Sequence, residues 1–246
     1  MSNIVASIWK YLKNFLNVHY FNQQATKYIP YLAIASALCI AFGLIDGLFF
    51  APTDYQQKDA FRIIYVHVPC AILSMLVYSL MALFSFQYLV WHLKICDILA
   101  KHCATLGLIF TALALATGSI WGKPMWGTWW FWDARLTSEF ILLFIYLGYL
   151  GLRATITQRS ISSKAAAIYA LVGLVDIPII HFSVNWWHTL HQGSSLLQFK
   201  FNTQSTSIHP DMLLPLISML IGFVLYFMTL LMMKVCTEIR INHARV

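Results

Sequence analysis

The chain has 246 residues, of which 60% are hydrophobic and only 10% are charged. Soluble domains are about 45–50% apolar and about 25% charged, so this chain has too few polar side chains to cover a surface that faces water. Its length alone would permit one or two soluble domains. The composition excludes them and predicts an integral membrane protein.

Six apolar stretches follow one another along the chain. A helix needs about 20 apolar residues to cross about 30 Å of hydrocarbon. The stretches are continuous and not alternating, which favours helices over a membrane barrel. Three of them contain no charged residue, whereas Asp46, Glu139 and Asp176 each lie in one of the others. We predict one all-α membrane domain, residues 1–246, a bundle of six transmembrane helices at residues 30–50, 63–91, 104–120, 136–152, 165–184 and 212–233.

The basic residues indicate how the bundle is oriented. If the N-terminus lies inside, 11 of the 16 Lys and Arg residues fall in inner segments. The positive-inside rule favours this orientation. It places both termini in the cytoplasm and residues 51–62, 121–135 and 185–211 outside, and it makes 94–101 and 153–164 the inner connections. The net charge of +7 then reflects topology, with membrane lipid as the neighbour and no nucleic acid expected.

Three smaller features complete this description. Residues 1–26 carry a loose apolar stripe, which fits either a helix on the membrane surface or a soluble tail, and no cleavable signal peptide is evident. The five cysteines are expected to be small buried apolar residues, since no C-x-x-C pair is present. Prolines inside spans, at 69, 178 and 215, are expected to kink them.

The second outer segment is dense in tryptophan. Five of the nine tryptophans lie within residues 121–132. An interfacial aromatic belt is one interpretation, but a belt needs only one or two rings at each helix end. Gly122 and Gly127 lie between the rings, where glycine lets the backbone turn tightly or approach a flat ligand. We favour a stacking platform for a large planar apolar ligand, formed by Trp121, Trp126, Trp129, Trp130 and Trp132.

Two histidines flank this segment in the sequence. His67 lies five residues past Arg62, about 7 Å below the outer boundary at the rise of a helix, and His191 lies in the third outer segment. A lone histidine in a membrane protein is usually a core residue with its hydrogen bonds satisfied. Here, however, the tryptophan segment, His67 and His191 all fall at the same membrane face. Two neutral imidazoles from different helices suit axial ligation of haem iron. Zinc fits less well, because no cysteine or carboxylate cluster completes a tetrahedral site. On a helix His188 would share a face with His191, and its role stays open.

Charged residues near this face have two interpretations each. Arg62, Lys123 and Arg135 offer cations for the two propionates of a haem, or they are ordinary interfacial anchors. Asp133 either caps the helix that begins near Arg135 or pairs with Arg135 or another cation.

The whole pattern resembles a known family. Residues 121–133, followed by Ala-Arg-Leu-Thr, resemble the WWD signature of haem-handling membrane proteins, and within that group the chain is similar to CcmC, the haem exporter protein C family. The resemblance covers nearly the whole chain. Its other landmarks, in order, are Tyr55-Gln-Gln, Arg62-Ile-Ile-Tyr-Val-His67-Val-Pro, Thr117-Gly-Ser, and Trp186-Trp187 followed by Leu190-His191-Gln-Gly.

The resemblance implies a specific role. In the family, two outer histidines that match His67 and His191 ligate the iron of a non-covalent haem b. The WWD segment, which includes the five tryptophans and Asp133, lies at the periplasmic face. The family works in the bacterial inner membrane, presents haem to the chaperone CcmE, and helps to form the covalent haem–chaperone bond. It acts beside the CcmA–CcmB ABC transporter and the small CcmD. No G-x-x-x-x-G-K-[ST] motif is present, so the ATPase belongs to a partner, and no catalytic residue is expected in this chain.

Three rival functions stay open at this point. A permease would move haem across the bilayer, for which the spans offer few mid-membrane polar groups besides Asp46 and Asp176. A synthetase would join haem directly to apocytochrome, but such WWD proteins tend to be larger. A scaffold for the transporter would not need the haem site. Whether the chain is an enzyme is not decided by its sequence, and intramembrane acids are functional candidates by default.

Overall fold

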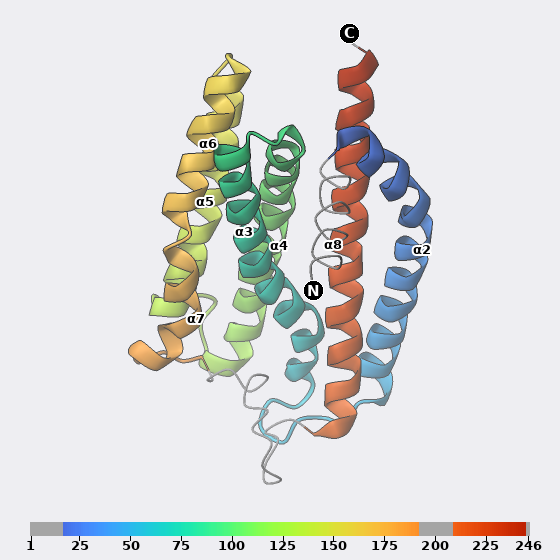
Figure 1. The fold of residues 1–246 in the computed structure, drawn as a ribbon. Helices are drawn as coiled ribbons and strands as arrows, with labels where there is room; N and C mark the ends of the chain where they lie inside the picture. Colours follow the sequence, from blue (N-terminus) through green and yellow to red (C-terminus); the bar gives the residue numbers. More distant parts are fainter. Residues whose placement is uncertain (1–16, 192–208, 245–246) are drawn as a thin grey trace, which may run out of the picture.

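The computed structural model describes residues 17–191 and 209–244. In this part the chain is helical, with short connections (Figure 1). The elements in order are α2 (Val18–Ile45), the π-helix η1 (Asp46–Phe50), the 3₁₀ helix η2 (Asp59–Ile63), α3 (Ile64–Trp91), α4 (Lys94–Trp126), α5 (Ala134–Thr155), α6 (Arg159–Gly173), α7 (Asp176–Trp186) and α8 (Pro210–Ala244).

Six helical segments in the described part are long and apolar enough to cross a membrane, which confirms the predicted all-α bundle. They run past the predicted bounds, because hydropathy marks only the part in hydrocarbon while helical hydrogen bonds continue into the polar interface. They are Tyr20–Phe50, Asp59–Trp91, Lys94–Trp126, Ala134–Thr155, Arg159–Trp186 and Pro210–Asn242. Residues 1–16 of the predicted N-terminal stripe, and 192–208 of the third outer segment, lie outside the described residues.

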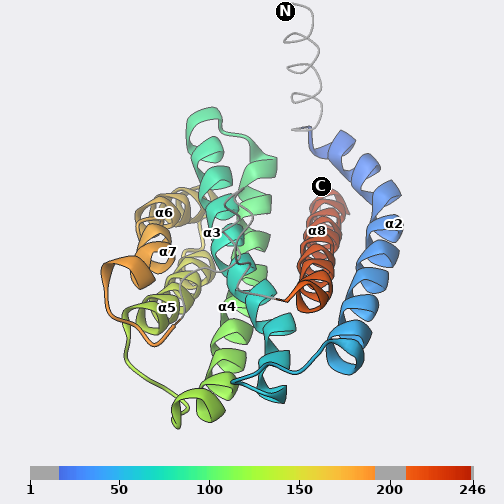
Figure 2. The same ribbon diagram turned by 90° about the horizontal axis from the view of Figure 1, so that it is seen from below.

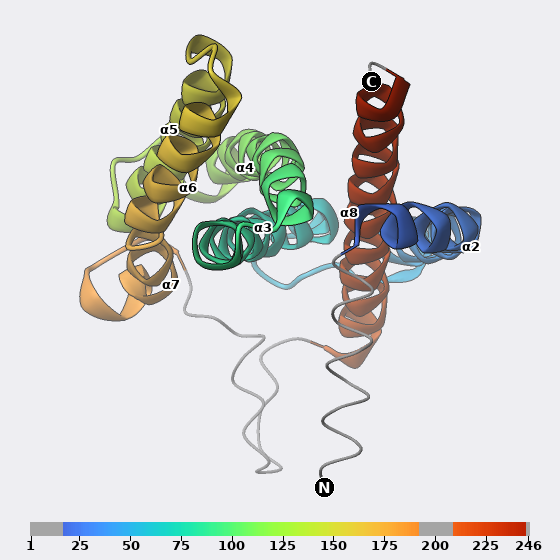
Figure 3. The same ribbon diagram turned by 45° about the horizontal axis from the view of Figure 1, so that its top comes forward.

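The bundle has three parts, which Figures 2 and 3 show from two further directions. The antiparallel pair α3 and α4 occupies the middle, with α5, α6 and α7 on one side and the pair α2 and α8 on the other. The turn between α3 and α4 is only His92-Leu93, with His92 in the left-handed region at φ 54°. The segment 94–101, predicted as an inner connection, is therefore the beginning of α4.

Buried tyrosines join the helices of the core. The Tyr146 hydroxyl of α5 donates to the Ser74 carbonyl of α3 at 2.8 Å, and the Tyr78 hydroxyl of α3 donates to the Ala170 carbonyl of α6 at 3.0 Å. Both tyrosines are fully buried. In hydrocarbon such hydrogen bonds between helices add to close packing, because no water competes for the groups. All five cysteines are free and four are buried, as expected.

The fifth span is broken in the middle. α6 ends at Gly173 and α7 begins at Asp176, and the two are separated by a turn. Pro178 has no N–H for the Leu174 carbonyl, which accepts instead from the Ile177 amide at 3.2 Å. The expected effect of Pro178 is thus confirmed, whereas α3 and α8 continue through their prolines.

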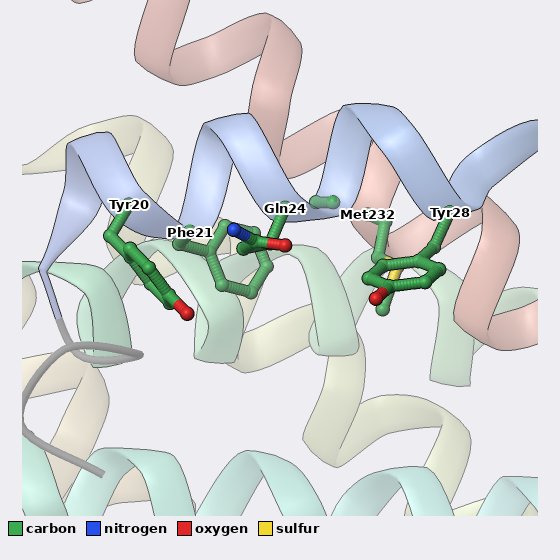
Figure 4. A pocket seen from close by; sticks show the side chains of 6 residues that line it. Tyr20, Phe21, Gln24, Tyr28 and Met232 are labelled. Carbon is green, nitrogen blue, oxygen red and sulfur yellow. The ribbon is translucent and has the colours of Figure 1, made fainter. Parts of the chain in front are cut away.

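The three predicted outer segments are at one end of the bundle. The connection from η1 to η2, the connection from α4 to α5 and the end of α7 all lie at the lower end in Figure 1, while α2 begins and α8 ends at the other. A shallow pocket where α2 crosses α8 lies toward that opposite end (Figure 4) and is lined by Tyr20, Phe21, Gln24, Ala25, Tyr28 and Met232. It is therefore not part of the face that carries the tryptophans.

Candidate functional site

The tryptophan-rich segment is partly helical. α4 continues to Trp126, so the first six residues of the predicted outer segment 121–135 form its last turns. Gly127 ends the helix in the left-handed conformation, at φ 77°, and its amide donates to the Lys123 carbonyl at 3.0 Å. A residue with a side chain would be strained there, so this glycine fixes where the helix stops.

His67 is held by the facing surface of α4. Its Nδ1 lies 3.1 Å from the Ala114 carbonyl oxygen and 3.1 Å from the Thr117 hydroxyl oxygen. The Thr117 hydroxyl donates to the Leu113 carbonyl at 2.6 Å, which leaves its oxygen as an acceptor. Because both partners accept, Nδ1 carries the proton, and the neutral ring keeps the lone pair on Nε2. The ring is thus prepared to bind a metal through Nε2.

Two further groups surround His67. A Cβ added to Gly118 would lie 3.0 Å from His67 Cε1, so the glycine lets the ring pack against α4. The Trp121 ring meets His67 edge to face, with centroids 5.5 Å apart. Trp121 Nε1 in turn donates to Gln57 Oε1 at 3.0 Å, which ties the indole to the connection between η1 and η2.

His191 is held by Asp133. The imidazole Nδ1 lies 3.1 Å from Asp133 Oδ2, and Asp133 Oδ1 accepts from the Leu136 amide at 2.7 Å. Asp133 is therefore the N-cap of α5, which confirms that interpretation, and it binds His191 at the same time. Burial of the Asp133 side chain opposes its charge, but the hydrogen bonds from His191 and from the Leu136 amide outweigh it and hold the pKa of the carboxyl below its usual value. An ionised Asp133 keeps the proton of His191 on Nδ1 and leaves Nε2 free.

The end of α4 supplies one indole to each histidine. Trp126 meets His191 edge to face with centroids 5.0 Å apart, as Trp121 does His67. A Cβ at Gly122 would come within 3.0 Å of the Trp126 ring, so this glycine makes room for the indole. The two imidazoles are close enough that a positive charge on one would disfavour a positive charge on the other. The structure therefore brings His67, His191, Trp121 and Trp126 together.

The other three tryptophans do not contact either histidine ring. Trp130 packs edge to face on Trp132 and on Phe140 of α5. Trp129 and Trp132 are exposed on the surface, Trp132 by 68%. The segment thus presents two rings to the histidines and two rings, Trp130 and Trp132, to Phe140 of α5. Trp129 and Trp132 are the two that are exposed.

The predicted cations differ in their positions. Arg62 donates to the Gly47 carbonyl at 2.6 Å and to the Ala51 carbonyl at 3.2 Å, and pairs with Asp59 at 3.1 Å. Its guanidinium thus holds the connection after η1. Lys123 is exposed and donates to the Gly127 carbonyl.

Arg135 lies closer to the histidines. It belongs to the first turn of α5, donates to the Ile180 carbonyl of α7 at 3.4 Å, and lies near enough to His67 for its charge to favour the neutral imidazole. His188 and His181, by contrast, are exposed. In the described residues no three His, Cys, Asp or Glu side chains gather at a single point that would suit a metal ion.

Three supporting residues were not predicted as such from the sequence. Thr117 and Gly118 hold or accommodate His67, and Gln57 holds Trp121. The signal was present, because positions 114, 117, 118 and 121 recur at helical spacing and share one face of α4. The partner of that face, His67, comes from a different helix, so only the packing of α3 on α4 reveals the contact.

Comparison with known proteins identifies the family of the chain. A model of the family described as heme exporter protein C matches residues 11–246. The chain is 50% identical over 207 residues to Heme exporter protein C of Escherichia coli strain K12, which covers 84% of this chain and 82% of that protein. Heme exporter protein C of Haemophilus influenzae is 44% identical over 232 residues, 94% of this chain and 93% of that protein. A putative cytochrome c biosynthesis ccmC-like mitochondrial protein of Marchantia polymorpha is 46% identical over 189 residues, 77% of each. The chain therefore belongs to the heme exporter protein C family.

Proposed function

We propose that this chain binds haem b non-covalently at the periplasmic face of the inner membrane and delivers it to the haem chaperone CcmE during maturation of c-type cytochromes. The observation that carries the proposal is the pair of imidazoles. His67 and His191 come from different parts of the chain, each has Nδ1 held by a fixed acceptor, and no group of the described residues forms a hydrogen bond with either Nε2. Such a pair suits the two axial positions of haem iron.

The side chains around the iron site have separate roles in this proposal. Trp121 and Trp126 fix the histidine rings and supply apolar surface to the porphyrin. Arg135 provides positive charge for a propionate, while Arg62 acts indirectly by holding the connection that carries Gln57. The haem itself supplies the reactive vinyl groups and the iron. The chain positions the cargo and contributes no acid, base or nucleophile.

The exposed part of the WWD segment is the proposed contact for the chaperone. Trp129 and Trp132 belong to the same segment as Trp121 and Trp126 but lie on the surface, where large aromatic rings mark binding sites. The bacterial relatives are named heme exporter proteins, and we infer CcmA, CcmB and CcmD as further partners of this chain. The charge asymmetry of the sequence supports cytoplasmic termini and a periplasmic site.

Delivery is tested with purified components. The chain is isolated with its endogenous haem and mixed with the haem-free periplasmic domain of CcmE, and the two are then separated. We expect haem to leave the chain and appear with the chaperone. Haem that stays with the chain, or that instead joins apocytochrome directly, would contradict delivery to CcmE. Haem uptake into proteoliposomes that contain this chain alone would favour a permease.

A glycine substitution tests how tightly His67 must be held. Gly118→Ala places a methyl group 3.0 Å from His67 Cε1, so the ring must move by a few tenths of an ångström and its hydrogen bonds to Ala114 and Thr117 lengthen. We expect the haem content of the purified protein to fall by roughly tenfold, as for loss of an outer-shell partner. Gly151→Ala is the control, because a Cβ there meets nothing within 4 Å. Equal haem in both variants would contradict the role of Gly118.

A further inference from the structure

Two carboxylates are buried between the helices that carry the site. Glu139 of α5 and Asp176 of α7 lie within predicted spans and are only 8% and 7% exposed. Glu139 Oε1 and Asp176 Oδ2 are buried atoms that have no hydrogen-bond partner in the described part of the chain. A buried carboxylate oxygen without a partner is costly in hydrocarbon. The cost is reduced only if the carboxylate pairs with a positive charge or binds a proton.

The two acids lie at the same level of two neighbouring helices. α5 and α7 contact each other and run in opposite directions, and the Arg135 guanidinium of α5 donates to the Ile180 carbonyl of α7 at 3.4 Å. Glu139 follows Arg135 by one helical turn and Asp176 precedes Ile180 by one turn, which places the two carboxylates across the same contact. Asp176 also opens α7, at the break of the fifth span, where the positive end of the helix favours a negative charge.

Hydroxyl groups of α3 and α5 lie near the acids, namely Ser74 and Tyr146 near Glu139 and Tyr78 near Asp176. The three hydroxyls donate to backbone carbonyls, so they do not neutralise either carboxylate.

Arg135 is the cation of this cluster. It lies one helical turn before Glu139, on the same face of α5, and its charge interacts with that of Glu139. Arg135 is also coupled to Asp133, but Asp133 is already bound by His191 and by the Leu136 amide. One cation beside two buried acids leaves one negative charge too many if both acids are ionised. Two carboxylates in such a buried site bind one proton between them, which removes the repulsion between two negative charges.

We propose that Glu139 and Asp176 form an intramembrane proton-binding site, in which the pair holds one proton and one negative charge that balances Arg135. The site lies next to the candidate haem site, because the charge of Arg135 reaches both Glu139 and His67. Its effect on bound haem rests on the proposed function, whereas the proton site itself does not.

Infrared spectroscopy tests the proton site without haem. The full chain in detergent at neutral pH is expected to show the C=O stretching band of one buried protonated carboxyl. Glu139→Gln and Asp176→Asn should each abolish the band, because the remaining acid then takes the negative charge. Glu139→Asp should keep it, and Ser138→Ala, a buried neutral change next to Glu139, is the matched control. A wild-type spectrum without the band, or single variants that each keep about half of it, would overturn the proposal.

The potential of bound haem gives a second measurement. Either single neutral variant should leave the midpoint potential near that of the wild type, since one negative charge remains. The double variant Glu139→Gln/Asp176→Asn should raise the potential, and Arg135→Gln should lower it, because the variants remove charges of opposite sign. Equal additive shifts from the two single variants would overturn the shared proton. Purified chain without haem would contradict the proposed function, while the infrared result would still decide the proton site.

Discussion

Replacement of His67 or His191 with alanine is expected to remove most of the haem that the wild-type protein retains on purification. Each imidazole offers its Nε2 as an axial ligand, and its loss should exceed the roughly 10–100-fold effect of an outer-shell partner. Haem content is measured by pyridine haemochrome. Any residual haem should lose the low-spin spectrum of two nitrogen ligands, and free imidazole in the buffer should restore it in part.

His188→Ala is the matched control for these variants. His188 lies three residues before His191, at the same end of the bundle, but it is exposed. Its replacement should leave haem content and spectrum unchanged. An unaltered spectrum in both His67→Ala and His191→Ala would exclude these residues as ligands, and so would a His188 variant as severe as the other two.

Substitution of Asp133 is expected to cause the second largest loss of haem. The residue has two roles that different substitutions can separate. As N-cap of α5 it accepts from the Leu136 amide, and as partner of His191 it keeps the Nε2 lone pair free for the iron. Asp133→Asn should preserve the cap, because Asn caps helices about as well as Asp, while the loss of charge should lower haem affinity by roughly 10-fold or more. Asp133→Ala should lose about 1 kcal/mol of stability in addition.

The pH dependence of unfolding separates the charge from the cap. The pKa of Asp133 is lowered in the folded protein, so its ionised form stabilises the fold above the unfolded value of about 3.9. That contribution is lost as the pH falls through the lower, folded value. The difference in thermal midpoint between wild type and Asp133→Asn should therefore be full at neutral pH and shrink below about pH 4. A difference that is constant between pH 3 and pH 7 would show that the charge contributes nothing.

Hydropathy and helix periodicity predicted the number of spans correctly, but not where each helix ends. The end of α4 illustrates the reason. Residues 121–126 were predicted as part of an outer segment because the apolar stretch ends at residue 120, yet they continue the helix to Gly127. A backbone that leaves hydrocarbon keeps its helical hydrogen bonds where packing against a neighbour supports them, and hydropathy does not report that packing.

The sequence by itself determined the class of protein, the six spans and the gathering of histidines and tryptophans at one face, because these depend on composition and on local spacing. Only the tertiary structure decided which groups meet. It brings Trp121 to His67 and Trp126 to His191, and it shows that Arg62 binds the backbone after η1. It also places Glu139 and Asp176 at the same level of the contacting helices α5 and α7. Each of these pairs joins elements that are distant in the chain, and contacts of that kind depend on how helices pack. No local pattern encodes them.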